Sequence, residues 1–274
     1  MKAKRLAVLL ICSLFLISCG TKKSTNGDGD GTAPKISNKD IVEANGRLEN
    51  IERLDSFVKN VNQKMKDKVR LVRYTIEGDP IFHTLDYDGS KLSLTLDTTE
   101  DKFGQGEVKT YDCTSIKKEE TNVQTQYFLE GCPNKEIGEL LKIAYDVDKE
   151  DLFAFQLKYG EGNETEINTR ELKLIIKRSN GDNTEVSDFQ FSKEEINKIY
   201  KLMVFANYLE EKKLSTKCEK ESNEPYELNV WINGATRHYE WRDCDQSKDG
   251  KVMTKLAQDI LQVLKGNSIY KRIE

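Results

Sequence analysis

Apolar residues recur along this chain with two different periods, and these periods predict where helices and strands lie. Between residues 48 and 65 apolar side chains return every three or four positions, which places them on one face of a helix. Five strand-like runs follow, at residues 69–77, 81–88, 91–97, 107–116 and 122–129. Asp88-Gly89 is a turn signal between the second and third runs. The first half therefore predicts one helix laid over about five antiparallel strands, in the order αβββββ.

The second half predicts the order ββαββα. Two strand-like runs cover residues 152–159 and 171–178. The motif Ser192-Lys-Glu-Glu195 is a capping box, so we expect a helix from there to about Lys213. A strand pair at 226–232 and 235–242 follows, and a last helix covers about 249–265. Strands joined by short turns favour the α+β class over a doubly wound parallel sheet.

The strongest hairpin signal in the chain is Asn233-Gly234, between residues 226–232 and 235–242. Because side chains alternate along a strand, a two-residue turn puts most large apolar residues of this hairpin on one face. The opposite face then carries Asn229, Trp231 and His238, which form a candidate surface for a ligand or partner. The alternative is that the last helix or the chain 215–225 covers Trp231.

The N-terminus has the pattern of a bacterial lipoprotein signal. Three basic residues precede an apolar run at residues 6–17, which is shorter than a membrane-spanning helix, and Ser18-Cys19 follows it. We expect cleavage before Cys19 and a diacylglyceryl group on its thiol, with palmitate among its fatty acids, so that two acyl chains hold the protein at a membrane. The alternative is an ordinary cleaved signal with a cysteine near the cut.

This signal sets the expected domain organisation. We expect a signal peptide at residues 1–18, a flexible tether rich in Gly, Ser, Asn and Asp at 19–39, and α+β domains at 40–148 and 149–274. Removing the signal takes three positive charges away, which leaves 40 basic against 47 acidic residues. An acidic chain without a clustered basic face argues against nucleic-acid binding.

Four cysteines remain for the exported body, and an even number outside a membrane favours disulfides. The pairing that is local in sequence, Cys113 with Cys132 and Cys218 with Cys244, is favoured over two other pairings. Free thiols are also possible. No C-x-x-C spacing occurs, so we expect no metal site.

Few residues are available for catalysis. The only histidines are His83 and His238, and His83 falls among aliphatic residues, which predicts a buried and hydrogen-bonded side chain. The chain lacks a nucleophile elbow, a phosphate loop and a dinucleotide fingerprint, so we assign no catalytic residue and no cofactor.

Three stretches carry a likeness to a known family. They are Arg73-Tyr-Thr-Ile-Glu-Gly-Asp-Pro-Ile-Phe-His83, Asp97-Thr-Thr-Glu-Asp-Lys-Phe-Gly104 and Lys198-Ile-Tyr-Lys-Leu-Met203. They resemble an uncharacterised lipoprotein family of Gram-positive bacilli that carries a domain of unknown function. The resemblance implies attachment to the outer face of a single cell membrane, and no catalytic residues can be carried over from that family.

Three functions remain open from the sequence. We expect a non-enzymatic, lipid-anchored extracytoplasmic protein that binds an unknown protein or small molecule at the cell surface. The alternative is a cell-envelope hydrolase with two carboxylates across a cleft. A transporter's binding component is disfavoured, because it requires two doubly wound lobes.

Overall fold

The computed structural model describes residues 35–160, 164–177, 181–217 and 224–273, and those from Ile36 onward form one compact unit. Its first elements are β1 (Ile41–Ala44), β2 (Arg47–Glu49), α1 (Ile51–Asn62), β3 (Asp67–Tyr74), β4 (Pro80–Tyr87), β5 (Leu92–Asp97), β6 (Val108–Cys113), β7 (Ser115–Glu120), β8 (Gln124–Glu130), α2 (Lys135–Gly138) and β9 (Glu139–Ala144). The predicted boundary between residues 148 and 149 stays a prediction.

The remaining elements follow a short 3-10 turn, η1 (Val147–Lys149). They are β10 (Phe153–Tyr159), β11 (Thr165–Asn168), β12 (Lys173–Lys177), β13 (Asn183–Ser187), α3 (Lys193–Phe205), β14 (Pro225–Ile232), β15 (Ala235–Arg242), α4 (Lys248–Gly266) and α5 (Tyr270–Ile273). The α+β class is confirmed, and helices pack on antiparallel strands in both halves. The described chain contains more strands than the sequence predicted: β1, β2, β7, β9, β11 and β13 are additional.

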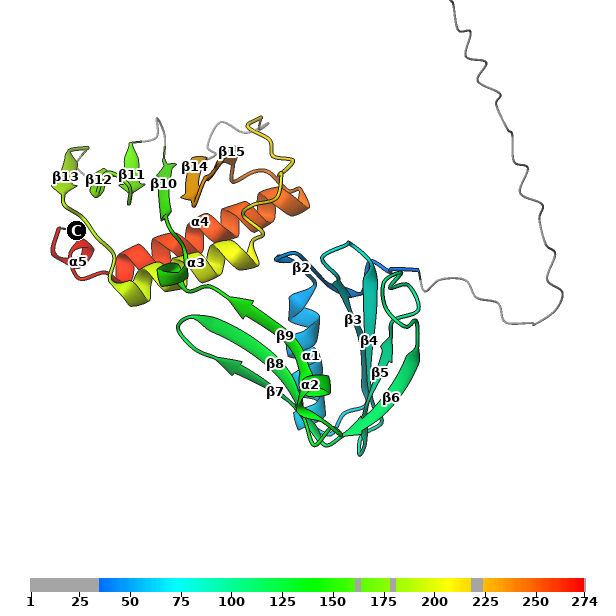
Figure 1. Ribbon diagram of the computed structural model, residues 1–274. Coiled ribbons are helices and arrows are strands. Elements are labelled where there is room, and N and C mark those ends of the chain that lie inside the picture. Colours follow the sequence, from blue (N-terminus) through cyan, green and yellow to red (C-terminus); the bar gives the residue numbers. More distant parts are fainter. Residues whose placement is uncertain (1–34, 161–163, 178–180, 218–223, 274) are drawn as a thin grey trace, which may run out of the picture. The chain divides into compact units, whose positions relative to one another are not determined.

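Two sheets share the first half of the compact unit. One has the order β2-β1-β3-β4-β5-β6, in which only the β1–β3 pair is parallel, and the other has the order β7-β8-β9. Helix α1 contacts both sheets and lies between them in Figure 1. Its residues Leu54, Phe57 and Val61 are buried there, as expected for the inner face of an amphipathic helix. The helix is shorter than predicted, because Leu48 belongs to β2 and Met65 is exposed beyond the last turn.

The second half contains a single antiparallel sheet in the order β13-β12-β11-β10-β14-β15. Helices α3 and α4 cover one face of it (Figure 1). The predicted capping box is present at the start of α3, where Ser192 and Glu195 bond each other's main-chain amides. The predicted two-residue turn is present too, since Ile232 pairs with Ala235. The covered face of β14 and β15 carries the predicted buried residues: Tyr226, Leu228, Val230, Ile232, Tyr239 and Trp241.

Helix α3 ends earlier than predicted because of Asn207. This residue has a φ of 51°, in the left-handed region that asparagine tolerates better than most residues, and it turns the chain away from the helix. Its side-chain oxygen accepts from the Leu48 amide at 2.7 Å, and its side-chain nitrogen donates to the Leu48 carbonyl at 2.6 Å. One asparagine thereby pairs with the main chain of β2, at a sequence distance of 159 residues.

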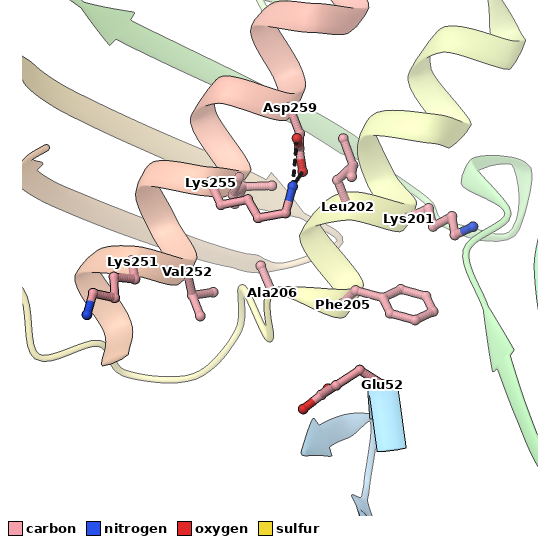
Figure 2. Close-up of a pocket in the computed structure, with 10 residues that line it drawn as sticks. Glu52, Lys201, Leu202, Phe205, Ala206, Lys251, Val252, Lys255 and Asp259 are labelled. Atoms are coloured by element: carbon pink, nitrogen blue, oxygen red, sulfur yellow. Dashed lines mark hydrogen bonds and ion pairs between the residues drawn. The ribbon is translucent and has the colours of Figure 1, made fainter. Parts of the chain in front are cut away.

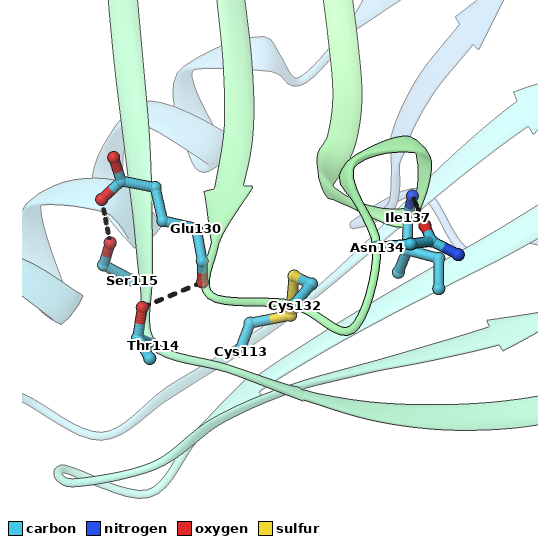
Figure 3. The surroundings of a disulfide bond; sticks show 7 residues. All are labelled: Cys113, Thr114, Ser115, Glu130, Cys132, Asn134 and Ile137. Atoms are coloured by element: carbon cyan, nitrogen blue, oxygen red, sulfur yellow. Dashed lines mark hydrogen bonds between the residues drawn. A yellow bond between two sulfur atoms is a disulfide. The ribbon is translucent and has the colours of Figure 1, made fainter.

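The first of the two predicted disulfides is present, between Cys113 at the end of β6 and Cys132 beyond β8 (Figure 3). It lies beside the start of the β7–β8 pair, where the Thr114 amide donates to the Glu130 carbonyl at 2.7 Å. Gly131 has a φ of 66°, and a Cβ there would lie 2.4 Å from the Thr114 side chain, so the turn requires glycine. Cys218 lies outside the described residues, and its pairing with Cys244 stays a prediction.

The predicted environment of His83 is correct only in part. Its neighbours across the sheet are Leu71 and Leu96, and burial lowers the pKa of its imidazole to about 4, which keeps the ring neutral at pH 7. The expected hydrogen bond is missing at one nitrogen, because Nδ1 has no partner among the described residues.

Candidate functional site

The three residues predicted to form a surface lie together on one face of the sheet. Asn229 and Trp231 are on β14 and His238 is on β15, directly opposite Asn229 in the strand register. This face is the one that α3 and α4 leave uncovered, because the buried residues of the hairpin alternate with these three. The last helix therefore does not cover Trp231.

A row of hydrogen bonds crosses this face from β15 to β11. The Nδ1 atom of His238 lies 2.7 Å from Oδ1 of Asn229, and Nδ2 of Asn229 donates to Oε1 of Gln156 at 3.0 Å. Nε2 of Gln156 then donates to Oε1 of Glu166 at 2.6 Å. Both amides point their donors toward Glu166, so the row has one direction and ends at a carboxylate. We call these four residues the polar row.

Glu166 is the buried end of the polar row. Only 9% of this residue is exposed, and Asn168, which also donates to its Oε1 at 3.0 Å, is 2% exposed. Burial opposes the ionised form, but the hydrogen bonds from Gln156 and Asn168 and the nearby ammonium of Lys173 outweigh it. The pKa of Glu166 is therefore lowered, and its carboxylate is ionised at pH 7.

Trp231 lies beside the polar row and has one close cationic neighbour. The Arg170 guanidinium carbon is 4.9 Å from the centroid of the indole ring, within the range of a cation–π contact. Trp231 is partly buried, and its register partners are Ala154 on β10 and Thr236 on β15. The small size of these neighbours leaves the ring as the largest apolar group on this part of the face.

The sequence did not indicate Gln156, Glu166, Asn168 or Arg170. The first lies in a predicted strand, but β11, which carries Glu166 and Asn168, is only four residues long. The one pattern that could have indicated this strand is Thr165-Glu-Ile-Asn168, in which Glu166 and Asn168 are two positions apart and therefore lie on the same face of a strand. Which strand would pair with which was not visible, because β10 pairs with β14 across more than 60 residues of intervening chain.

Removing Glu166 is expected to destabilise the fold. In Glu166→Ala the amides of Gln156 and Asn168 lose a shared buried acceptor, so we expect a loss of ~1–3 kcal/mol in the free energy of unfolding at pH 7. Because the folded pKa is lower than the unfolded value, the ionised carboxylate stabilises fully above about pH 4.3 and this contribution is lost as the pH falls through the folded pKa. Urea unfolding at pH 7 and pH 3 measures both effects.

The control for this prediction is Glu185→Gln on β13, where the carboxylate is exposed. It removes the same charge without touching the polar row, so its unfolding free energy should match that of the wild type at both pH values. If Glu166→Ala lost no more stability at pH 7 than this control, the polar row would not contribute to stability.

A second candidate site is an apolar groove between α3 and α4, with a volume of ≈ 560 Å³ (Figure 2). Its floor is apolar and its edges carry three lysines and two carboxylates. The lining residues are Glu52, Lys201, Leu202, Phe205, Ala206, Lys251, Val252, Lys255, Leu256 and Asp259. Val252 of α4 packs against the core but is only partly buried, and it lines this groove.

The three lysines of the groove differ in their partners. Lys255 pairs with Asp259 one turn further along α4, with Nζ 2.8 Å from Oδ2. Lys201 pairs with Glu120, and its ammonium lies 5.7 Å from the Phe205 ring centroid. Lys251 makes no ion pair within the described ranges. One cationic group at the edge is therefore available to an incoming anion.

The described residues give no evidence for a metal centre or a membrane span. No group of three or more His, Cys, Asp or Glu side chains in them could hold a metal ion. None of the helices in the described ranges is both long and apolar enough to cross a membrane. Cys19, the predicted lipidation site, lies outside the described residues.

Comparison with known proteins places one domain in this α+β chain. Residues 38–128 match a family model described as a domain of unknown function, DUF4362. The match begins just before β1 and ends within β8, so it includes α1 but excludes Cys132, β9 and the whole second half. No curated protein and no solved structure matches the chain.

Proposed function

We propose that this protein is a lipid-anchored, extracytoplasmic binding module without enzymatic activity. The observation that supports a binding function is the groove between α3 and α4, where Leu202, Phe205 and Val252 remain open to solvent beside charged residues. Pockets that bind ligands are typically apolar hollows of this size with a few polar groups at fixed positions. Attachment at Cys19 would hold the groove near the membrane surface.

The binding function is tested by crosslinking in cells. A photoreactive phenylalanine analogue at Val252 faces the groove, and the same analogue at Gln258 is exposed on α4 outside it. We expect a light-dependent adduct from position 252 and none from position 258. Equal adducts from both positions, or none from position 252, would reject the groove as a binding site.

The anchor is tested separately. We expect labelled palmitate to be incorporated into the wild-type protein and not into Cys19→Ser, and we expect Cys19→Ser to leave the membrane fraction. A variant that stays in the membrane fraction without label would show that something other than acyl chains holds the protein.

The polar row and Trp231 offer a second surface for the same function. The indole ring is positioned by Arg170 beside hydrogen-bonding groups, an arrangement that suits stacking on a planar or ring-shaped partner group. If this surface binds the partner, Trp231→Ala should weaken binding while the Val252 adduct is unchanged.

The alternative is a cell-envelope hydrolase. Hydrolysis of a glycoside requires two carboxyl groups that face each other across a cleft. Among the lining residues of the groove the carboxylates are Glu52 and Asp259, and Asp259 forms an ion pair with Lys255. Release of soluble fragments from cell-wall glycan by the purified protein, abolished by Glu52→Gln, would favour the hydrolase.

A further inference from the structure

We propose that two loops of the first half, at residues 75–79 and 98–107, dock with a partner protein through an apolar pocket that lysine or arginine side chains border. This surface is separate from the groove and goes beyond the function proposed for it. The loops carry Ile76, which is 95% exposed, and Phe103, which is 78% exposed. These are the two most exposed large hydrophobic side chains in the part of the chain that the structure describes. We call this pair the apolar tip.

The two loops lie side by side at one end of the same sheet. The first joins β3 to β4 and the second joins β5 to β6, and these four antiparallel strands are neighbours in the sheet. Asp79, which is 4% exposed, ties the loops together, because its carboxylate accepts from the Lys102 amide at 3.1 Å and from Lys102 Nζ at 2.7 Å. Ile76 precedes Asp79 by three residues and Phe103 follows Lys102 directly, so the two apolar side chains stand on adjoining turns.

Hydrogen bonds within each loop fix its shape. In the first loop the Thr75 amide donates to the Asp79 carbonyl at 2.9 Å, and Oγ1 of Thr75 accepts from the Asp79 amide at 3.1 Å. In the second, Oδ1 of Asp101 accepts from the amides of Phe103 and Gly104, both at 3.0 Å. Loops that are already ordered lose less conformational entropy on binding. The apolar tip is therefore preformed for contact with a partner.

The charge of the loops selects the kind of partner. Together they contain five carboxylates and one lysine, a net charge of −4, which equals the net charge of the whole chain of 274 residues. Salt bridges neutralise two of the carboxylates, Asp79 and Glu107. The other three, Glu77, Glu100 and Asp101, form no ion pair within the described ranges. A partner with cationic side chains around an apolar pocket complements both the charge and the apolar tip.

A lipid bilayer fits these observations less well. Exposed apolar side chains can enter a bilayer, but a surface that contains anionic lipids has a negative potential and repels loops of the same sign. A second copy of the chain that met the first tip to tip would also bring like charges together. Both are therefore outcomes of the test.

Crosslinking in cells tests this surface with the full chain. A photoreactive phenylalanine analogue replaces Phe103, and the control carries the same analogue at Met65. Met65 is 46% exposed and lies just before β3, at the opposite end of the same sheet. We expect a light-dependent protein adduct from position 103 and none from position 65. Mass spectrometry should place the attachment in a partner segment that has apolar residues next to lysine or arginine.

A matched pair of variants tests the role of charge in the chain that carries the analogue at position 103. Glu77→Gln/Glu100→Gln removes two carboxylates beside the apolar tip, and Glu139→Gln/Glu185→Gln removes two exposed carboxylates elsewhere. We expect the first variant to lower the adduct yield about threefold or more, and the second to leave it unchanged.

A second matched pair tests the apolar contact in the same chain. Ile76→Asn should lower the adduct yield about tenfold, because burial of this side chain stabilises the complex, and Met65→Asn should leave the yield unchanged. Both side chains are exposed, so both variants are expected to fold, and circular dichroism melts check this.

The proposed docking surface would be rejected by any of several results. They are the absence of an adduct from position 103, an equal adduct from position 65, an adduct with lipid or with a second copy, and a partner segment without lysine or arginine. A yield that either tip variant changes no more than its control would reject it too. The crosslink at Val252 is independent, so an adduct there with none at position 103 would reject the apolar tip and leave the groove standing.

Discussion

Replacing Trp241 with alanine is expected to cost ~3–5 kcal/mol in the free energy of unfolding, the range for a large aromatic residue removed from a core. Trp241 is 1% exposed and stacks on Tyr226, with ring centroids 5.2 Å apart and planes 12° apart. Its indole nitrogen donates to Oγ1 of Thr254 on α4 at 3.0 Å. The substitution therefore removes packing, a stacked pair and a link between the sheet and its covering helix.

The other tryptophan of the chain provides the matched control. Trp231 lies on the same hairpin with its side chain on the opposite face, and its main described contact is with Arg170. We expect Trp231→Ala to cost less than ~1 kcal/mol, the order of an exposed cation–π contact. Urea unfolding followed by circular dichroism compares the two variants without depending on tryptophan fluorescence. Equal losses would show that the two faces of the hairpin are equally buried.

Removing the disulfide between Cys113 and Cys132 is expected to cost about 3 kcal/mol. The bond joins residues 19 apart. A cross-link of this span lowers the conformational entropy of the unfolded chain, which stabilises the folded state by about 3 kcal/mol. Both half-cystines also pack against the hydrophobic core, where two serine hydroxyls would be less favourable. The double variant Cys113→Ser/Cys132→Ser should therefore unfold at a clearly lower urea concentration than the wild type.

Reductant distinguishes the stability contributed by this bond from that contributed by the second predicted pair, Cys218 and Cys244. In the double variant the bond at residues 113 and 132 is already absent, so any further loss of stability on adding reductant reports on Cys218 and Cys244. An unchanged midpoint for the double variant in the absence of reductant would show that the Cys113–Cys132 bond does not stabilise the fold.

The sequence predicted best where the signal is local. Asn233-Gly234 specifies a two-residue turn, and the alternation on either side of it specifies which residues face the helices, so the placement of Trp231 and Trp241 on opposite faces followed directly. The capping box at Ser192 is equally local. By contrast, β2 has three residues and β11 has four, which is too short for a period to be recognised.

The remainder depends on which segments meet in space. Residues 107–116 read as one strand, yet the chain leaves one sheet after Cys113 and enters another at Ser115. The polar row requires β10 to pair with both β11 and β14, and the groove requires α3 and α4 to lie side by side. No local pattern determines these non-local pairings, and for this reason Glu166 and the groove were missed.

The link between Asn207 and Leu48 bears on how this protein can be divided for experiments. The DUF4362 match stops at residue 128, so a fragment cut at its borders would end inside β8. The fragment would also lack Cys132, strand β9 and the asparagine that saturates the exposed edge of β2. The segment that matches the family model, residues 38–128, is thus smaller than the compact unit in which it packs. Expressing that segment alone would expose an unpaired strand edge, which is prone to aggregation.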